Sequence, residues 1–152
     1  MFKHILVPTD GSELSNETVA SAVQFATETK ASITFLYVRP DYPVAYFGEG
    51  ALVDPTTPES FSEMTEKMAQ EILDRSSAVA KASGVSCATR SQINDLPYEA
   101  IIETATEKGC DLIYMASHGR RGLVGLLLGS ETQKVLTHST IPVLVYRAAE
   151  KA

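Results

Sequence analysis

Short runs of β-branched and apolar residues alternate along the chain with longer amphipathic stretches. The apolar runs predict strands at about Phe2–Val7, Ala31–Val38, Val85–Ile93, Asp111–Ala116 and Ile141–Tyr146. The longer stretches predict helices at about Glu13–Lys30 and Pro58–Ser83, from Pro97 until Gly109, and at Ser130–Thr137. Strands that alternate with helices need crossover connections, so the pattern predicts an α/β domain with a mainly parallel, five-stranded sheet.

Local signals refine the helices. Ser12 and Asp95 are expected to be the N-caps of the first and third helices, because their side chains can accept hydrogen bonds from free backbone N–H groups. We expect the helix of Pro58–Ser83 to bury an apolar stripe formed by Phe61, Met64, Met68, Ile72 and Val79.

Composition and charge narrow the function classes. The 152 residues are 44% hydrophobic and 21% charged, which is typical of a soluble globular chain, and we expect one domain over residues 1–152. No membrane-spanning run and no signal-peptide pattern is found, so we expect a cytoplasmic protein. The net charge of -6 argues against binding to nucleic acid or to an anionic membrane, so any phosphate contact must be local. Cys87 and Cys110 fit no metal-ligand or redox spacing and are expected to be small buried hydrophobes.

A long irregular segment, Arg39–Thr57, separates the second strand from the second helix. It contains several aromatic residues, glycines and prolines. Loops of this length in compact domains are often lids, binding loops or mobile connections. The sequence leaves open whether this segment is a lid, a dimer element or simply mobile.

The glycine-rich segment Ser117–Ser130 follows the fourth strand and leads into a helix. Glycines let backbone N–H groups approach a ligand closely, and a helix N-terminus adds free donors and a positive dipole. Hydroxyl groups and two arginines are also present: Ser117, Ser130, Thr132, Arg120 and Arg121. This combination favours an anion site, and the alternative is a flexible glycine loop with solvated arginines.

A second candidate site is Pro8–Ser12, where the first strand ends. Ligands of open α/β sheets bind at the carboxyl ends of strands, at the point where the strand order reverses. Asp10 could there accept hydrogen bonds from adenine or ribose, and the alternative is that Asp10 and Ser12 only cap the next helix. The two candidate sites support each other only if the first and fourth strands are neighbours.

Three blocks of the chain resemble the universal stress protein family. The start, Ile5–Ser12, and the end, Ile141–Val145, match the family's termini. Its glycine marker is matched in its second part by Gly119 and, nine residues later, by Gly129 and Ser130. The resemblance implies a Rossmann-like open sheet of five parallel strands in the order 3-2-1-4-5, with helices on both faces, and a homodimer. It also implies ATP, or AMP or ADP, with Mg or Mn bound through the phosphates.

The same resemblance implies the positions of the ligand groups. Adenine is expected near Pro8, Thr9, Asp10 and Val38. The phosphates are expected at the segment Ala116, Ser117, His118, Gly119, Arg120, Arg121 and Gly122, and at Gly129, Ser130, Glu131 and Thr132. Ala116 departs from the family marker, which has glycine there. Alanine costs little in β geometry, but costs roughly 1–2 kcal/mol if the backbone must be left-handed.

Three function classes remain open. The first is a nucleotide-binding regulatory protein of the stress response that reports to an unknown protein partner. The second is an enzyme, but no carboxylate or nucleophile is paired in sequence with His118, so we expect at most slow ATP hydrolysis and no catalytic residue. The third is a dimeric interaction module that has lost nucleotide binding. We expect the last strand, Ile141–Tyr146, to be an exposed sheet edge that pairs with a second copy of the chain.

Overall fold

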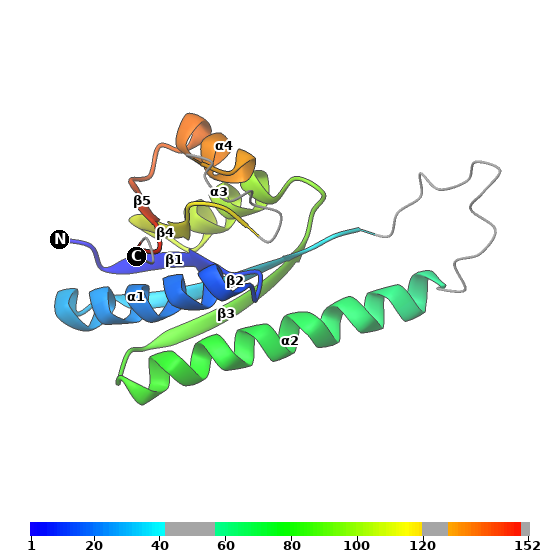
Figure 1. The fold of residues 1–152 in the computed structure, drawn as a ribbon, viewed down its shortest axis with the longest axis horizontal. Helices are drawn as coiled ribbons and strands as arrows, with labels where there is room; N and C mark the ends of the chain where they lie inside the picture. Colours follow the sequence, from blue (N-terminus) through cyan, green and yellow to red (C-terminus); the bar gives the residue numbers. More distant parts are fainter. Residues whose placement is uncertain (42–56, 120–127, 150–152) are drawn as a thin grey trace.

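A computed structural model describes residues 1–41, 57–119 and 128–149 (Figure 1). Within these ranges, strands and helices alternate in sequence order. The strands are β1 His4–Pro8, β2 Ser32–Arg39, β3 Cys87–Ile93, β4 Leu112–Ala116 and β5 Val143–Tyr146. The helices are α1 Glu13–Thr29, α2 Pro58–Ala82, α3 Pro97–Glu107 and α4 Ser130–His138.

The strands form one sheet in the order β3-β2-β1-β4-β5, and every pairing between neighbours is parallel. The predicted fold class and strand order are therefore confirmed. The last strand is shorter than expected, since Ile141 and Pro142 precede it. Pro142 has no N–H to donate to a strand ladder, although its carbonyl accepts a hydrogen bond from the Ile113 N–H at 2.9 Å.

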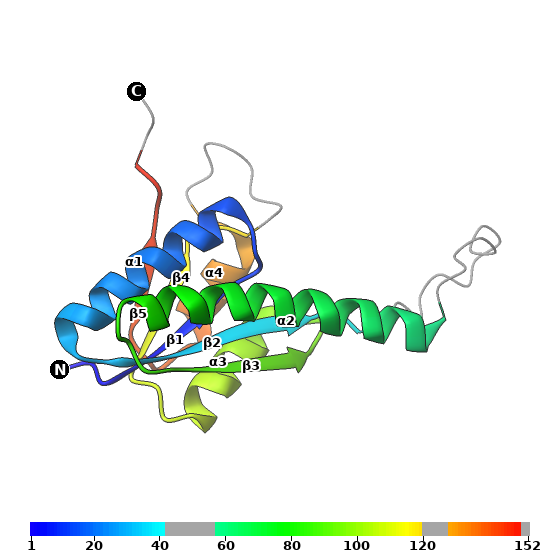
Figure 2. The same cartoon turned by 90° about the horizontal axis from the view of Figure 1, so that it is seen from below.

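The helices lie in two layers, with α1 and α2 on one face of the sheet and α3 and α4 on the other (Figures 1 and 2). Alternate residues of each strand point to the two faces, so Ile5 and Val7 pack under α1 while Leu6 packs under α3. The central strands are buried from both sides, which explains why β1, β2 and β4 read as continuous apolar runs.

The predicted apolar stripe of α2 is wrong at three positions. Met64, Met68 and Val79 are 51%, 37% and 41% exposed. The buried stripe consists instead of mostly small residues: Thr65, Ala69, Ile72, Leu73, Ser76 and Ala80. Small side chains let the helix axis lie close to the sheet, so the larger methionines turn outward. No helix within the described ranges is long and apolar enough to cross a membrane.

The two predicted N-caps have different outcomes. The Ser12 side chain accepts a hydrogen bond from the Ser15 N–H, so this prediction is confirmed. The prediction for Asp95 is wrong, because the N-cap of α3 is Leu96, which makes no side-chain cap hydrogen bond. The Asp95 carboxylate accepts instead from the Asp41 N–H at 3.1 Å.

Asp111 ties β1 to β4 at the amino ends of these strands. Its two carboxylate oxygens accept hydrogen bonds from the N–H groups of Lys3 and His4, at 2.8 and 3.0 Å. Its own N–H donates to the His4 carbonyl at 2.9 Å. Burial alone would raise the pKa of Asp111, but the backbone donors outweigh it and hold the pKa below its ordinary value.

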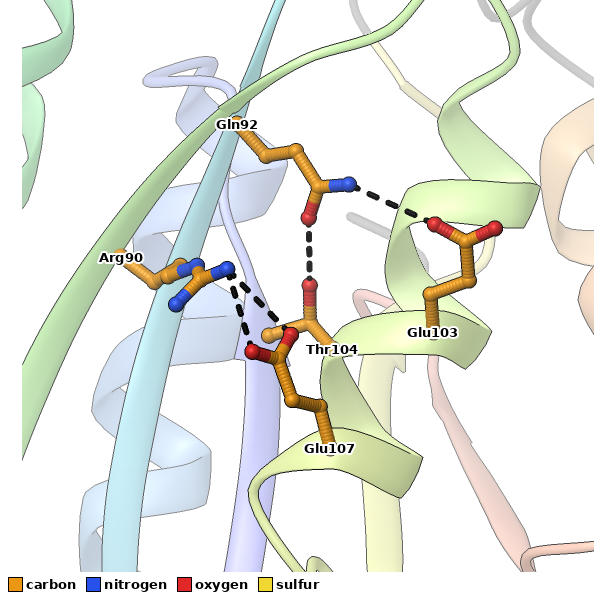
Figure 3. A network of polar contacts seen from close by, with 5 residues as sticks. All are labelled: Arg90, Gln92, Glu103, Thr104 and Glu107. Atoms are coloured by element: carbon orange, nitrogen blue, oxygen red, sulfur yellow. Dashed lines mark hydrogen bonds and ion pairs between the residues drawn. The ribbon is translucent and has the colours of Figure 1, made fainter.

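A polar network fixes α3 beside β3 (Figure 3). Arg90 of β3 pairs with Glu107 at 3.2 Å, and the Gln92 amide donates to Glu103 at 3.4 Å. The fully buried Thr104 hydroxyl donates to the Gln92 amide oxygen at 2.9 Å. These contacts hold the C-terminal half of α3, and its first turn faces the site described next.

Candidate functional site

A cavity of about 200 Å³ opens between the carboxyl ends of β1 and β4. It lies at the point where the strand order reverses, which is where open α/β sheets bind ligands. Much of its wall is apolar and comes from the sheet and from α3, through Pro8, Leu36, Val38, Pro97, Ile101, Met115 and Ala116. The polar wall contains Thr9, Asp10, Ser15, His118, Gly119, Glu131 and Thr132.

The β1 side of the cavity is held by Ser15, in the first turn of α1. The Ser15 hydroxyl lies 2.8 Å from the Thr9 hydroxyl and accepts from the Asp10 N–H at 3.1 Å. One carboxylate oxygen of Asp10 accepts from the Ser12 N–H at 2.9 Å. Asp10 therefore supports the turn into α1 and also lines the cavity, so the capping and ligand-binding interpretations are compatible.

The β4 side continues from Ala116 into Ser117 and His118, which lie against the start of α4. The Ser117 carbonyl accepts from the Gly129 N–H at 2.7 Å, and the Thr132 hydroxyl donates to the Ala116 carbonyl at 2.9 Å. A Cβ added to Gly129 would lie 3.0 Å from the Cα of His118, closer than side chains normally pack. Glycine at position 129 therefore suits the close approach of two backbones, since its own φ of -68° is open to any residue.

A second close approach joins the two sides of the cavity. A Cβ added to Gly119 would lie 3.2 Å from a carboxylate oxygen of Asp10. The two candidate sites predicted separately from the sequence thus meet in space. The condition set for them, that the first and fourth strands are neighbours, is fulfilled by the β1–β4 pairing.

The N-terminus of α4 faces this cavity through Glu131 and Thr132. Its N-cap is Gly129, which provides no side-chain cap hydrogen bond, and the first bond within the helix runs from the Gln133 N–H to the Gly129 carbonyl. The N–H groups of the first turn and the positive end of the helix dipole are therefore available for an anion. Such an end is a ready phosphate-binding position.

Comparison with known proteins decides the family. The model of the universal stress protein family matches residues 1–147. The chain belongs to the universal stress protein family. A curated relative, the universal stress protein MJ0531 of Methanocaldococcus jannaschii, is 34% identical over 99% of this chain and 85% of its own length.

Two solved structures share the fold of this universal stress protein over nearly its full length. The protein MJ0577 of Methanocaldococcus jannaschii has a TM-score of 0.77 and 27% identity, with 99% of each chain covered. A universal stress protein solved in complex with cAMP has a TM-score of 0.71 and 25% identity, with 97% of this chain and 99% of the other covered.

Not all of the residues expected from the sequence to contact the nucleotide line the cavity. Nine of them line it: Pro8, Thr9, Asp10, Val38, Ala116, His118, Gly119, Glu131 and Thr132. Ser117 is buried behind it, where its N–H donates to the Tyr146 carbonyl, and Ser130 is exposed at the start of α4. Arg120, Arg121 and Gly122 lie outside the described residues, as does most of Arg39–Thr57.

Ala116 stands where the family marker has glycine. The structure shows which backbone conformation, β or left-handed, this alanine adopts. The residue ends β4 and pairs with Tyr146. Within the described residues, Lys30 alone among non-glycine residues has a positive φ, so Ala116 needs no left-handed backbone. The substitution therefore carries no backbone strain, and its methyl group adds to the apolar wall of the cavity.

Five lining residues were not predicted from the sequence: Ser15, Leu36, Pro97, Ile101 and Met115. Leu36 lies two residues before Val38, so the two side chains point to the same face of the strand, and this alternation could have suggested Leu36. Met115 directly precedes Ala116, so alternation gives no such signal for it. Pro97 and Ile101 belong to the first turns of α3. Only the strand order, which places α3 over β1 and β2, brings them to the cavity.

Proposed function

We propose that this universal stress protein binds an adenine nucleotide in the cavity between β1 and β4 and acts as a regulatory protein of the stress response. The observation that carries the proposal is the open N-terminus of α4 beside a cavity with a largely apolar wall at the switch point of the sheet. A related protein solved with cAMP supports an adenine nucleotide as the ligand class.

In this proposal, the base lies against the apolar wall formed by Leu36, Val38 and Ile101. Thr9 and Asp10 supply polar atoms for the base or the ribose, since both lie at the end of β1 within the cavity wall. The phosphates bind the first-turn N–H groups of α4 and the connection at His118 and Gly119.

ATP is the proposed physiological ligand, with AMP and ADP as related ligands. In the described parts of the chain, no three His, Cys, Asp or Glu side chains gather into a set that could hold a metal ion. We therefore propose that Mg or Mn arrives on the phosphates, as Mg²⁺ does in many nucleotide sites. The ion would neutralise part of the phosphate charge next to Asp10 and Glu131.

We also propose that the protein binds ATP without efficient turnover. Two of the described polar residues proposed to lie near the phosphates are already engaged, because His118 Nδ1 lies 3.2 Å from the Ser117 hydroxyl and Glu131 accepts from the Tyr98 N–H. Efficient hydrolysis would need a group that positions water. Phosphate release from magnesium ATP faster than about one turnover per minute would contradict this proposal.

The ligand proposal is tested on the purified protein. Heat denaturation should release adenine nucleotide into the supernatant, identified by its absorbance and by chromatography. Protein freed of nucleotide should then bind magnesium ATP in a calorimetric titration. No heat at millimolar ATP would favour the third function class, an interaction module without a nucleotide.

We propose a homodimer through the outer edge of β5. All four residues of β5 are only half-buried, whereas the first four residues of the neighbouring β4 are buried. Pro142 and Tyr146 accept hydrogen bonds from the β4 side, so alternation turns the N–H of Val145 to the open edge.

Light scattering at micromolar concentration tests the dimer. The wild-type protein should have the mass of a dimer, and Val145→Pro, which removes an edge donor, should shift it toward the monomer. A wild-type monomer at that concentration would contradict the proposal.

A further inference from the structure

Glu131 reaches from α4 to the first turn of α3. One of its carboxylate oxygens accepts from the Tyr98 N–H at 2.9 Å, although the two residues are 33 positions apart. Tyr98 is the second residue of α3, and the N-cap of this helix, Leu96, makes no side-chain cap hydrogen bond. Glu131 therefore caps α3 from a different helix.

Further contacts hold this cap in place. The second carboxylate oxygen of Glu131 lies 3.5 Å from Lys134 Nζ, one turn along α4. The Lys134 ammonium lies 5.6 Å from the centre of the Tyr98 ring. The centre of the His138 ring lies 5.4 Å from the centre of the same Tyr98 ring. These contacts pack the first turn of α3 against α4, on the same face of the sheet (Figure 1).

The N-termini of α3 and α4, both beside the cavity, consequently differ. A helix N-terminus attracts an anion through its positive dipole end and through any first-turn N–H group that has no partner. The α3 end is occupied by the Glu131 carboxylate, whereas Gly129 leaves the α4 end without a side-chain cap. Of these two helix ends, that of α4 is the one open to a phosphate in the cavity.

Glu131 also places a negative charge on the cavity wall. The described lining residues include two carboxylates, Asp10 and Glu131, and neither lysine nor arginine. A carboxylate near a phosphate chain disfavours each additional phosphate charge by Coulomb repulsion, which a bound divalent cation offsets.

We propose that Glu131 is a positioning residue that sets the phosphate specificity of the site. It closes the α3 end, directs the phosphates to the α4 end, and makes polyphosphate binding depend on a divalent cation. This inference rests on the proposed binding of adenine nucleotides. It predicts that the wild-type protein prefers AMP to metal-free ATP and loses that preference when magnesium is present.

Two substitutions separate the charge from the hydrogen bond. Glu131→Gln keeps an oxygen that can accept from the Tyr98 N–H but removes the charge. Glu131→Ala removes both. Glu28→Gln is the matched control, because Glu28 is an exposed residue near the C-terminal end of α1, at the opposite end of the sheet, and its substitution changes the net charge equally.

AMP and ATP are titrated calorimetrically into the four proteins, first with EDTA and then with excess magnesium. At roughly threefold per unit of phosphate charge, Glu131→Gln should raise the affinity for metal-free ATP about tenfold more than that for AMP. Magnesium should remove most of this difference. Glu131→Ala should bind both nucleotides more weakly than Glu131→Gln, and Glu28→Gln should behave as wild type.

An unchanged ratio of ATP to AMP affinity in Glu131→Gln would overturn the inference while leaving nucleotide binding intact. Equal affinities of the Gln and Ala variants would overturn the positioning role. If the wild-type protein binds neither nucleotide under either condition, the proposed function itself fails, and the inference fails with it.

Discussion

The two ends of the β1–β4 strand pair differ: the amino ends are joined by hydrogen bonds, and the carboxyl ends border a cavity. At the amino ends, Asp111 accepts from two N–H groups of the β1 segment and donates to its backbone, so the strands are tied together. At the carboxyl ends, the chains lead into α1 and α4 and leave the cavity between them. Between the two ends, the strands pair at only two positions: Ile5 lies opposite Leu112, and Leu6 lies opposite Ile113.

Because the two ends differ in this way, substitutions at the amino end and at the carboxyl end should affect different properties of the protein. The side-chain and backbone groups at the amino end are satisfied by one another, so changes there should alter folding stability and leave ligand affinity unchanged. The carboxyl end contains an open helix N-terminus and two close glycine contacts, so changes there should alter affinity first.

Cys110, two residues before β4, gives the largest expected effect, which is on the reactivity of its thiol. Burial, with help from the neighbouring Asp111, raises the pKa of its thiol to about 11 from an ordinary value of 9.0. The reactive thiolate at pH 8 should therefore be about 100-fold less populated than in an exposed cysteine. Alkylation of a Cys87→Ser protein, followed by mass spectrometry, measures this. Labelling as fast as that of an unfolded cysteine peptide would mean that the amino end is not closed.

Gly129→Ala should have the largest effect on binding. The new Cβ would lie 3.0 Å from the Cα and 3.1 Å from the Cβ of His118, so His118 must shift away from the start of α4. We expect the affinity for AMP to fall about 30-fold, while the protein remains folded with a loss of roughly 1–2 kcal/mol. Wild-type affinity in a calorimetric titration would separate the α4 end from the ligand site.

Gly109→Ala is the matched glycine substitution at the amino end. Gly109 has a φ of +67°, and nothing lies within 4 Å of an added Cβ, so the cost is backbone strain without a clash. We expect a stability loss of about 1–2 kcal/mol in urea unfolding and an unchanged nucleotide affinity. A change in affinity as large as that of Gly129→Ala would break the comparison between the two ends.

Asp111→Asn should have the smallest effect and a pH signature. The folded pKa of Asp111 lies below its unfolded value of about 3.9, so its contribution is present above that pH and is lost as the pH falls through the folded pKa. We expect a loss of about 0.5–1 kcal/mol at pH 7, since the contacts are partly exposed. The difference between the two proteins should shrink below pH 4, and a constant difference would exclude this carboxylate as its source.

Periodicity and turn residues were sufficient to predict the α/β class and most element boundaries within one or two residues. The wrong stripe of α2 shows their limit. Choosing the largest apolar residues favoured Met64 and Met68, but close packing against the sheet selected Ala69 and Ser76 instead. Sequence alone does not reveal how near a helix lies to its sheet.

For the candidate site, local sequence gave the segments at both sides of the cavity but not the contact between them. The family resemblance supplied the strand order, and the structure added the approach of Gly119 to Asp10. The cap of α3 was missed for the same reason. Asp95 is adjacent in sequence, yet the carboxylate that reaches the helix comes from Glu131, in another helix.

A crystal structure of the protein with AMP tests the central claim most directly. The phosphate oxygens should lie about 3 Å from first-turn backbone nitrogens of α4, with the base against Leu36, Val38 and Ile101. A nucleotide bound elsewhere, or one whose phosphate points away from α4, would contradict the account.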